Sequence, residues 1–335
     1  MPLMAAPALA EPQGLWLAAG VALVATLVAT GLMIPLLGRH VVDQPNARSG
    51  HEQPTPRGGG LAVLIGLALG LLVWFPDALP APWACLLAFA VLALTGFVDD
   101  VRSLNVRVRL IVQLTAAAVI ALTILAPDRP ADWVVAAAAV VFVAGYVNAF
   151  NFMDGANGVA VISGVVAGGW YAWLGFRDDL NGLVGAGLIL AAACLGFMWW
   201  NMRGRVFLGD VGSYLLGGLI SALCLLAWHA DVTWTEAGAP LVLFIADTAV
   251  TLVRRALSGE PIGEAHRDHV YQRVIDSGVS HPTMAMIIGG MTIVGCVTAG
   301  LTVEIPAISV ALWTMIIAAY LLLPRALRSM HRSTP

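Results

Sequence analysis

Two adjacent carboxylates, Asp99 and Asp100, end a long apolar stretch of the sequence. Like charges side by side repel each other, and at a membrane edge such a pair needs a cation, a proton or an arginine to offset it. Arg102 lies close enough in sequence to act as a purely structural partner. The pair is therefore a candidate site for a metal ion, and an exposed helix end is the structural alternative.

A second polar segment joins two apolar stretches and combines amides, one carboxylate and two glycines, namely Asn148, Asn151, Asp154, Gly155, Asn157 and Gly158. Carboxylate and amide oxygens are hard ligands suited to Mg²⁺, and amide N–H groups can bind a phosphate or a nucleobase. The structural alternative is a tight turn closed by Asn and Asp side chains. So polar a turn between membrane helices favours a functional site.

Two further carboxylates are candidates: Asp210 at the start of a predicted helix and Asp247 inside another. Asp210 lies in the segment from Phe207 to Ser213, where N–H groups next to glycine at a helix start could bind an anion and Asp210 could hold a metal beside it. A simpler interpretation makes Asp210 the N-cap of that helix. Asp247 lies inside an apolar stretch, which makes it a functional candidate, with an ion pair to Arg254 as the structural alternative.

Arginines and histidines supply the positive charge that phosphates require. They gather before a run of three glycines and again in a later connection: Arg48, His51, Arg57, Arg254, Arg255, His266, Arg267, His269 and Arg273. Contacts with lipid headgroups would explain many of them without catalysis, and the glycine run lacks the ending of a P-loop. Carboxylates, arginines and glycine-rich helix starts together indicate phosphoryl transfer assisted by Mg²⁺.

The elements that must position these residues are membrane helices. Of the 335 residues, 59% are hydrophobic and 11% are charged, and the mean hydropathy is +0.86, which excludes a soluble fold. We expect an all-α, polytopic integral membrane protein with one catalytic domain over residues 1–335. It should have about 11 transmembrane helices, near 15–38, 61–75, 82–98, 109–126, 133–147, 159–175, 183–200, 211–228, 239–253, 284–303 and 307–323.

The arginines orient these spans. All 17 basic residues are arginine, and only Arg129 and Arg177 fall on one side of the predicted bundle. The positive-inside rule makes the other side cytoplasmic, with the N-terminus outside and the C-terminus in the cytoplasm. The long connections, at approximately 39–60, 99–108, 148–158, 201–210 and 254–282, all fall on the cytoplasmic side. The chemistry therefore belongs there.

In their order and spacing these motifs resemble the polyprenyl-phosphate N-acetylhexosamine-1-phosphate transferases. That superfamily, in glycosyltransferase family 4, includes the phospho-N-acetylmuramoyl-pentapeptide transferases. The resemblance is carried by Pro54-Thr55-Pro56-Arg57-Gly58-Gly59-Gly60, Asp99-Asp100, Asn148 to Gly158, Leu195 to Asn201, Phe207 to Ser213, Asp247-Thr248 and Arg254-Arg255.

The resemblance implies an enzyme of the bacterial inner membrane whose active site faces the cytoplasm. It would transfer N-acetylhexosamine 1-phosphate from a UDP-N-acetylhexosamine to undecaprenyl phosphate, releasing UMP, and so initiate O-antigen or other envelope polysaccharide synthesis. Mg²⁺ is the implied cofactor, with Mn²⁺ as a substitute. Membrane lipids and a second copy of the chain are further expected partners, and nucleic acid is not.

The resemblance also assigns residues. Asp210 and Asp154 would hold the metal, and Asp99, Asp100 and Asp154 would be catalytic, with Asp99 or Asp154 as the base or nucleophile. Asn201 and Phe207 would bind the uridine, and Arg267 and His269 would approach the diphosphate or sugar. The substrate-binding set in full is Arg57, Asn148, Asn151, Asn157, Asn201, Phe207, Asp247, Arg267 and His269.

Two departures from the family pattern bear on the donor sugar. Many relatives have a second aspartate where this chain has Asn157, and they have a histidine cluster where it reads His266-Arg267-Asp268-His269. The pattern favours the O-antigen branch that uses N-acetylglucosamine or 6-deoxy sugars such as N-acetylfucosamine or N-acetylquinovosamine. Two other functions are distinguishable: a transporter of anionic substrates predicts polar residues at mid-membrane depth, and an inactive envelope scaffold predicts degenerate carboxylates.

Overall fold

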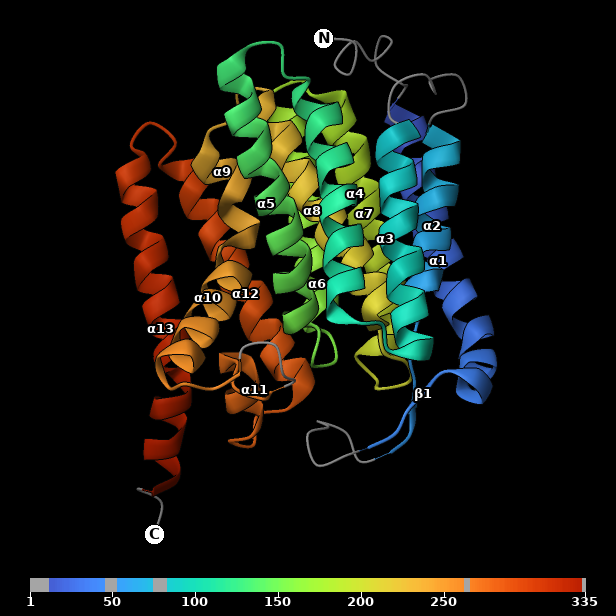
Figure 1. Cartoon of the computed structure of the whole chain (residues 1–335), viewed down its shortest axis with the longest axis vertical. Helices are drawn as coiled ribbons and strands as arrows, with labels where there is room; N and C mark the ends of the chain where they lie inside the picture. Colours follow the sequence, from blue (N-terminus) through green and yellow to red (C-terminus); the bar gives the residue numbers. More distant parts are fainter. Residues whose placement is uncertain (1–11, 46–52, 75–82, 262–265, 333–335) are drawn as a thin grey trace.

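The structure is a computed structural model and describes residues 12–45, 53–74, 83–261 and 266–332. Nearly all of this part of the chain is helical (Figure 1). The long helices are α1 (Pro12–His40), α2 (Gly60–Trp74), α3 (Trp83–Arg102), α4 (Val106–Leu125), α5 (Pro130–Met153), α6 (Val159–Arg177), α7 (Asn181–Asn201), α8 (Gly209–His229), α10 (Val242–Leu257), α12 (His281–Leu301) and α13 (Pro306–Arg332). The short elements are β1 (Val42–Asp43), β2 (Thr55–Pro56), α9 (Trp234–Gly238), η1 (Ala239–Leu241) and α11 (Val270–Ile275), and β1 pairs antiparallel with β2.

The helices confirm the expectation of an all-α, multi-pass membrane protein. Within the described residues, 10 helical segments are long and apolar enough to cross a bilayer, and α2 is a shorter apolar helix of 15 residues. One of the 10 runs through α9, η1 and α10. Pro240 lies in the first turn of η1, where a proline is tolerated because a residue at a helix start does not need its N–H for a helical hydrogen bond. Each of the eleven predicted spans thus corresponds to one apolar helix or helical run.

Several helices continue beyond the predicted spans into the polar motifs. α3 runs to Arg102 and α5 to Met153, so the carboxylate pair and the asparagines at positions 148 and 151 are helical, and the connection predicted at 148–158 shortens to residues 154–158. Hydropathy marks only the part of a helix that lies in the hydrocarbon, whereas the hydrogen-bonded helix extends past it into the headgroup region. The motif side chains therefore sit on rigid helix ends.

The bundle is built around α8, the most buried of the spans. It packs against α3 and α5, while α6 packs on α7 and α1 on α2 and α7. Gly96 permits the approach of α3 to α8, because a Cβ atom at this position would lie 2.2 Å from the carbonyl oxygen of Asp210. This close crossing brings Asp99 and Asp100 beside the first turn of α8.

The start of α1 and the end of α13 lie at opposite ends of the bundle, as an odd number of crossings requires (Figure 1). β1, α11 and the end of α13 share the lower end in this view. At the connection after α6, Arg177 pairs with Asp178 and with the buried Glu236, so this arginine has a structural role. The two ends of the bundle thus differ. The end after α6 has the Arg177–Glu236 ion pair, and the end with β1 and α11 carries the motif residues.

We expect labelling to place these two ends on opposite sides of the membrane. Cysteine at position 178 (Asp178→Cys) should react with an impermeant thiol reagent from outside, and cysteine at position 276 (Asp276→Cys) only after the cytoplasmic side is opened. The four native cysteines are buried, so they contribute little background. Labelling of both positions from the same side would contradict the predicted orientation.

Candidate active site

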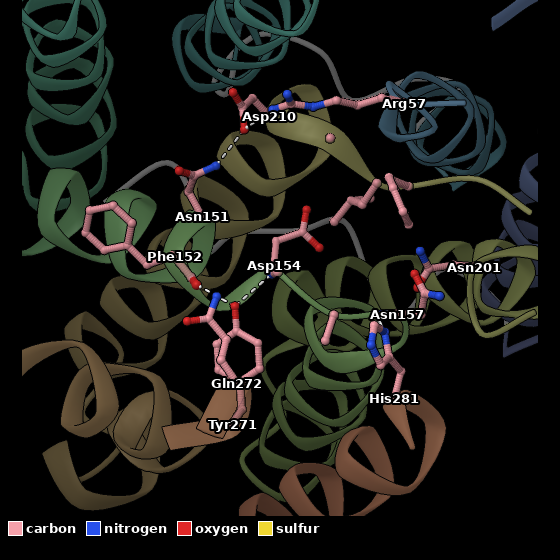
Figure 2. Close-up of a pocket in the computed structure, with 15 residues that line it drawn as sticks. Arg57, Asn151, Phe152, Asp154, Asn157, Asn201, Asp210, Tyr271, Gln272 and His281 are labelled. Carbon is pink, nitrogen blue, oxygen red and sulfur yellow. Dashed lines mark hydrogen bonds and ion pairs between the residues drawn. The ribbon is translucent and has the colours of Figure 1, made fainter. Parts of the chain in front are cut away.

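A cleft of about 260 Å³ opens where the motif-bearing helix ends meet (Figure 2). Its walls come from the segment before α2, the α5–α6 connection, the α7–α8 connection, α11 and the first residue of α12. The lining residues are Arg57, Asn151, Phe152, Asp154, Gly155, Ala156, Asn157, Asn201, Phe207, Leu208, Gly209, Asp210, Tyr271, Gln272 and His281. Six of the predicted site residues therefore lie in one cleft together with Asp154.

Arg57 links two carboxylates at one side of the cleft. Its Nε lies 2.5 Å from Asp100 Oδ1, and its Nη2 lies 3.0 Å from Asp210 Oδ1. Asn151 donates to the same Asp210 oxygen at 2.8 Å. Burial opposes the charge of Arg57, but the carboxylates of Asp210 and Asp100 outweigh it and raise the pKa of Arg57. This side of the cleft is a charge-compensated, preorganised network.

Asp100 lies behind this network and caps α8. Its carboxylate accepts the backbone N–H groups of Asp210 at 2.9 Å and Val211 at 3.2 Å, which are among the unpaired donors of a helix start. The interpretation of Asp210 as the N-cap is therefore wrong, because α8 begins at Gly209 and Asp100 satisfies those donors. Asp210 is free to direct its carboxylate toward the cleft.

Asp99 and Asn148 do not line the cleft. Asp99 is 5% exposed and accepts from Arg109 at 2.9 Å and from the Tyr214 hydroxyl at 3.0 Å. Asn148 donates to Gln113 at 2.7 Å. Both residues brace α3, α4, α5 and α8 against one another behind the cleft, so the geometry gives them supporting positions.

Asp154 differs from the other carboxylates because no donor in the described part of the chain hydrogen-bonds to its side chain. It lies between α5 and α6 and points into the cleft (Figure 2). Burial raises the pKa of Asp154 well above its usual value, and the nearby carboxylates of Asp210 and Asp100 add to the rise while Arg57 opposes it. A carboxylate in this setting requires a proton or a cation.

The predicted uridine-binding residues occupy the other side of the cleft. Asn201 is 4% exposed, accepts the N–H of Gly158 at 2.7 Å and donates to the carbonyl of Val206 at 3.0 Å. Its amide therefore joins the α5–α6 and α7–α8 connections. Phe207 and Asn157 also line the cleft.

Besides Asn148, three predicted substrate-binding residues lie outside the cleft. Asp247 and His269 are buried at 0% and 2% exposure and contact each other, with His269 Nδ1 3.0 Å from Asp247 Oδ1. Arg267 pairs with Asp276 at 2.7 Å. The alternative of an Asp247–Arg254 ion pair is wrong: Asp247 contacts His269 and Val270, and Arg254 donates to the backbone carbonyl of Asp268.

Four side chains line the cleft that the sequence analysis did not select: Phe152, Tyr271, Gln272 and His281. His281 follows Ser280, the N-cap of α12, and its Nδ1 accepts the N–H of Asn157 at 3.3 Å. The sequence signal for His281 was a histidine in the predicted cytoplasmic connection, just before the predicted span 284–303. Tyr271 and Gln272 lie two and three positions after His269 and carry no charge to mark them.

The donor set fits a magnesium ion bound together with phosphates. Among the described residues, no three His, Cys, Asp or Glu side chains converge to form a complete protein cage for a metal. Mg²⁺ prefers one or two carboxylates, with substrate phosphates and water supplying its other ligands. Asp154 and Asp210 meet that requirement in a polar cleft beside Arg57.

The part of the chain that carries much of this cleft is similar to known proteins. A family model described as glycosyl transferase family 4 matches residues 82–228, which include Asp99, Asp100, Asp154, Asn201 and Asp210. A Bacillus subtilis protein named probable undecaprenyl-phosphate N-acetylglucosaminyl 1-phosphate transferase is 28% identical over 287 residues, which cover 80% of each chain.

Two further relatives carry related names. The decaprenyl-phosphate N-acetylglucosaminephosphotransferase of Mycobacterium tuberculosis is 29% identical over 317 residues, covering 80% of this chain and 77% of that protein. The phospho-N-acetylmuramoyl-pentapeptide-transferase of Phenylobacterium zucineum is 26% identical over 264 residues, covering 65% of this chain and 68% of that protein. By the family match over residues 82–228 and the extent of these similarities, the chain is similar to members of glycosyl transferase family 4.

Proposed function

We propose that this protein transfers N-acetylhexosamine 1-phosphate from a UDP-sugar to undecaprenyl phosphate and releases UMP, with Mg²⁺ as cofactor. The observation that carries the proposal is the cleft in which Asp154, Asp210 and Arg57 converge at the end of a membrane-helix bundle. A lipid phosphate reaches such a site from the bilayer, and a nucleotide sugar reaches it from the cytoplasm. The proposed location is the cytoplasmic face of a bacterial inner membrane.

In the proposed reaction, an oxygen of the lipid phosphate forms a bond to the sugar-linked phosphorus of the donor. The anhydride bond to the other phosphate breaks, and UMP leaves with that electron pair. Both reactants are anions, so positive charge is needed to bring them together. A magnesium ion held by Asp154 and Asp210 would offset phosphate charge when bound.

The chain's own groups provide orientation and charge. Arg57 can approach a phosphate from the side of Asp210, because 33% of its side chain remains exposed. Asn151 and Asn157 supply amide groups that can contact phosphate or sugar. Asp100 and Asp99 hold α8 and α4 in place, so that Asp210 keeps its direction as charge builds up in the cleft.

A transfer assay with a donor labelled on its sugar-linked phosphate tests this proposal. Membranes containing the protein, undecaprenyl phosphate and Mg²⁺ should convert a UDP-sugar labelled with ³²P on the sugar-linked phosphate into an organic-soluble product. UMP should inhibit the reaction and, added to the product lipid, regenerate the UDP-sugar, because one phosphoanhydride replaces another. Label that stays entirely in soluble UDP would mean that the sugar moves without its phosphate.

The donor sugar is resolved by the same assay with several labelled donors. Two relatives carry N-acetylglucosamine in their names, which supports UDP-N-acetylglucosamine as the donor, and 6-deoxy relatives of that sugar are the alternatives to test. The position of the cleft at helix ends, rather than at mid-depth, supports an enzyme over a transporter. Accumulation of a soluble substrate in sealed vesicles, without lipid product, would favour transport instead.

A further inference from the structure

The hydroxyl of Tyr271 bridges two backbone groups of the connection that carries Asp154. It donates to the carbonyl of Phe152 at 3.0 Å and accepts the N–H of Gly155 at 3.0 Å (Figure 2). Tyr271 is fully buried, and burial raises the pKa of its hydroxyl, which therefore stays protonated. A single hydroxyl thus ties the backbone before Asp154 to the backbone after it.

This bridge matters because the Asp154 carboxylate receives no hydrogen bond of its own from the described residues. Its direction is therefore set by the backbone that carries it. Farther along, His281 accepts the N–H of Asn157, and Asn201 accepts the N–H of Gly158. Tyr271 is the side chain that holds the stretch from Phe152 to Gly155, where the carboxylate is attached.

α11, which carries Tyr271, is itself anchored by a buried network. The N–H of Val270 donates to both oxygens of Asp247 at 3.1 Å, and His269 contacts the same carboxylate. The Tyr320 hydroxyl of α13 donates to Asp247 at 2.7 Å. Asp247 therefore connects α10 and α13 to the start of α11, which explains an intramembrane carboxylate that does not reach the cleft.

We propose that Tyr271 is a positioning residue for transfer: its hydroxyl holds the backbone on both sides of Asp154, so that the carboxylate faces the cleft, and the Asp247–His269 pair anchors the helix from which it acts. The proposal rests on the proposed function. Reacting groups displaced by about 1 Å can lose on the order of 10²-fold in rate, so loss of this bridge should appear in turnover.

The test uses Tyr271→Phe, which removes the hydroxyl and keeps the ring, in the full chain. Tyr171→Phe is the matched control, because Tyr171 is also fully buried and its hydroxyl donates to a backbone carbonyl, that of Ala237, at 2.8 Å. Tyr271→Phe loses two buried tyrosine–backbone hydrogen bonds and Tyr171→Phe loses one, and Tyr171 contacts the segment next to η1 rather than the cleft. A general loss of stability should affect both variants alike.

We expect Tyr271→Phe to lower kcat by about 10- to 100-fold with little change in the KM for the donor, whereas Tyr171→Phe stays within about twofold of wild type. In the metal-free protein, hydrogen–deuterium exchange of peptides covering residues 152–158 should rise in Tyr271→Phe only. Equal kcat values for the two variants, or unchanged exchange in this segment, would overturn the proposal.

Gly155→Ala gives a second test. A Cβ atom at Gly155 would lie 2.2 Å from the Tyr271 hydroxyl oxygen, so the alanine must push that hydroxyl away. We expect Gly155→Ala to reduce kcat in the wild-type background and to cost less in the Tyr271→Phe background, where the hydroxyl contact is gone and the nearest atoms are Gln272 Nε2 at 3.1 Å and the ring Cζ at 3.3 Å. Additive losses would contradict the contact. If the wild-type protein transfers no labelled phosphosugar, the proposed function fails, and the exchange data still decide whether Tyr271 holds the segment.

Discussion

Asp154→Asn is expected to stabilise the metal-free protein while it lowers transfer by about 10³-fold or more. The carboxylate of Asp154 has no hydrogen-bond donor among the described residues and lies near Asp210, so removing its charge relieves an unfavourable interaction. We expect the free energy of unfolding to rise by about 0.5–2 kcal/mol, the usual range for a stabilising substitution at a site kept for function. Thermal unfolding in detergent and the ³²P transfer assay measure the two effects.

The pH dependence of this gain has a definite sign. Because the pKa of Asp154 is raised in the folded protein, its carboxyl favours folding at low pH, and this contribution is lost as the pH rises above the unfolded value of about 4. The advantage of the asparagine variant should therefore be present at pH 7 and vanish toward pH 4. Added Mg²⁺ should raise the unfolding temperature of wild type more than that of the variant. An equal shift in both would mean that Asp154 does not hold the metal.

Asp210→Asn is expected to reduce transfer by a similar factor of about 10³ or more, with the opposite effect on stability. Asp210 pairs with Arg57 at 3.0 Å and accepts from Asn151 at 2.8 Å. Loss of a charged hydrogen bond costs about 1.5–3 kcal/mol, so this variant should unfold at a lower temperature. The fold should survive, because Asp100 caps α8.

Asp178→Asn is the control for both substitutions, since Asp178 forms a partly exposed ion pair with Arg177 away from the cleft. Such pairs contribute about 0–1 kcal/mol, and transfer should be unchanged. Normal turnover of Asp210→Asn at limiting Mg²⁺ would show that Asp210 is not a metal ligand. Equal stability changes in Asp154→Asn and Asp210→Asn would contradict the difference in their hydrogen bonding.

Much of the cleft was predictable from residue type. Arg57, Asn151, Asp154 and Asp210 stand out in sequence because they combine a cation with carboxylates and amides, the groups that bind phosphate and Mg²⁺, beside glycines at helix ends. The intramembrane position of Asp247 and the family resemblance at His269 selected two further residues, yet these two form a buried pair at the start of α11. Charged and polar residues occur both in the cleft and in buried structural pairs, so residue type alone cannot separate a substrate contact from a structural anchor.

Composition and hydropathy by themselves determined that the chain is a bundle of membrane helices, because apolar runs of bilayer length have no other stable environment. The motif residues determined where charge and amides collect along the chain. Only the tertiary structure decided which carboxylates share the cleft: Asp100 turns to cap α8, whereas Asp154 lines the cleft and receives no side-chain hydrogen bond from the described residues. It alone also brought uncharged Tyr271 to the Asp154 segment across a long sequence separation. Such pairings depend on how helices cross, and helix crossing is set by side-chain packing between distant segments that no local pattern records.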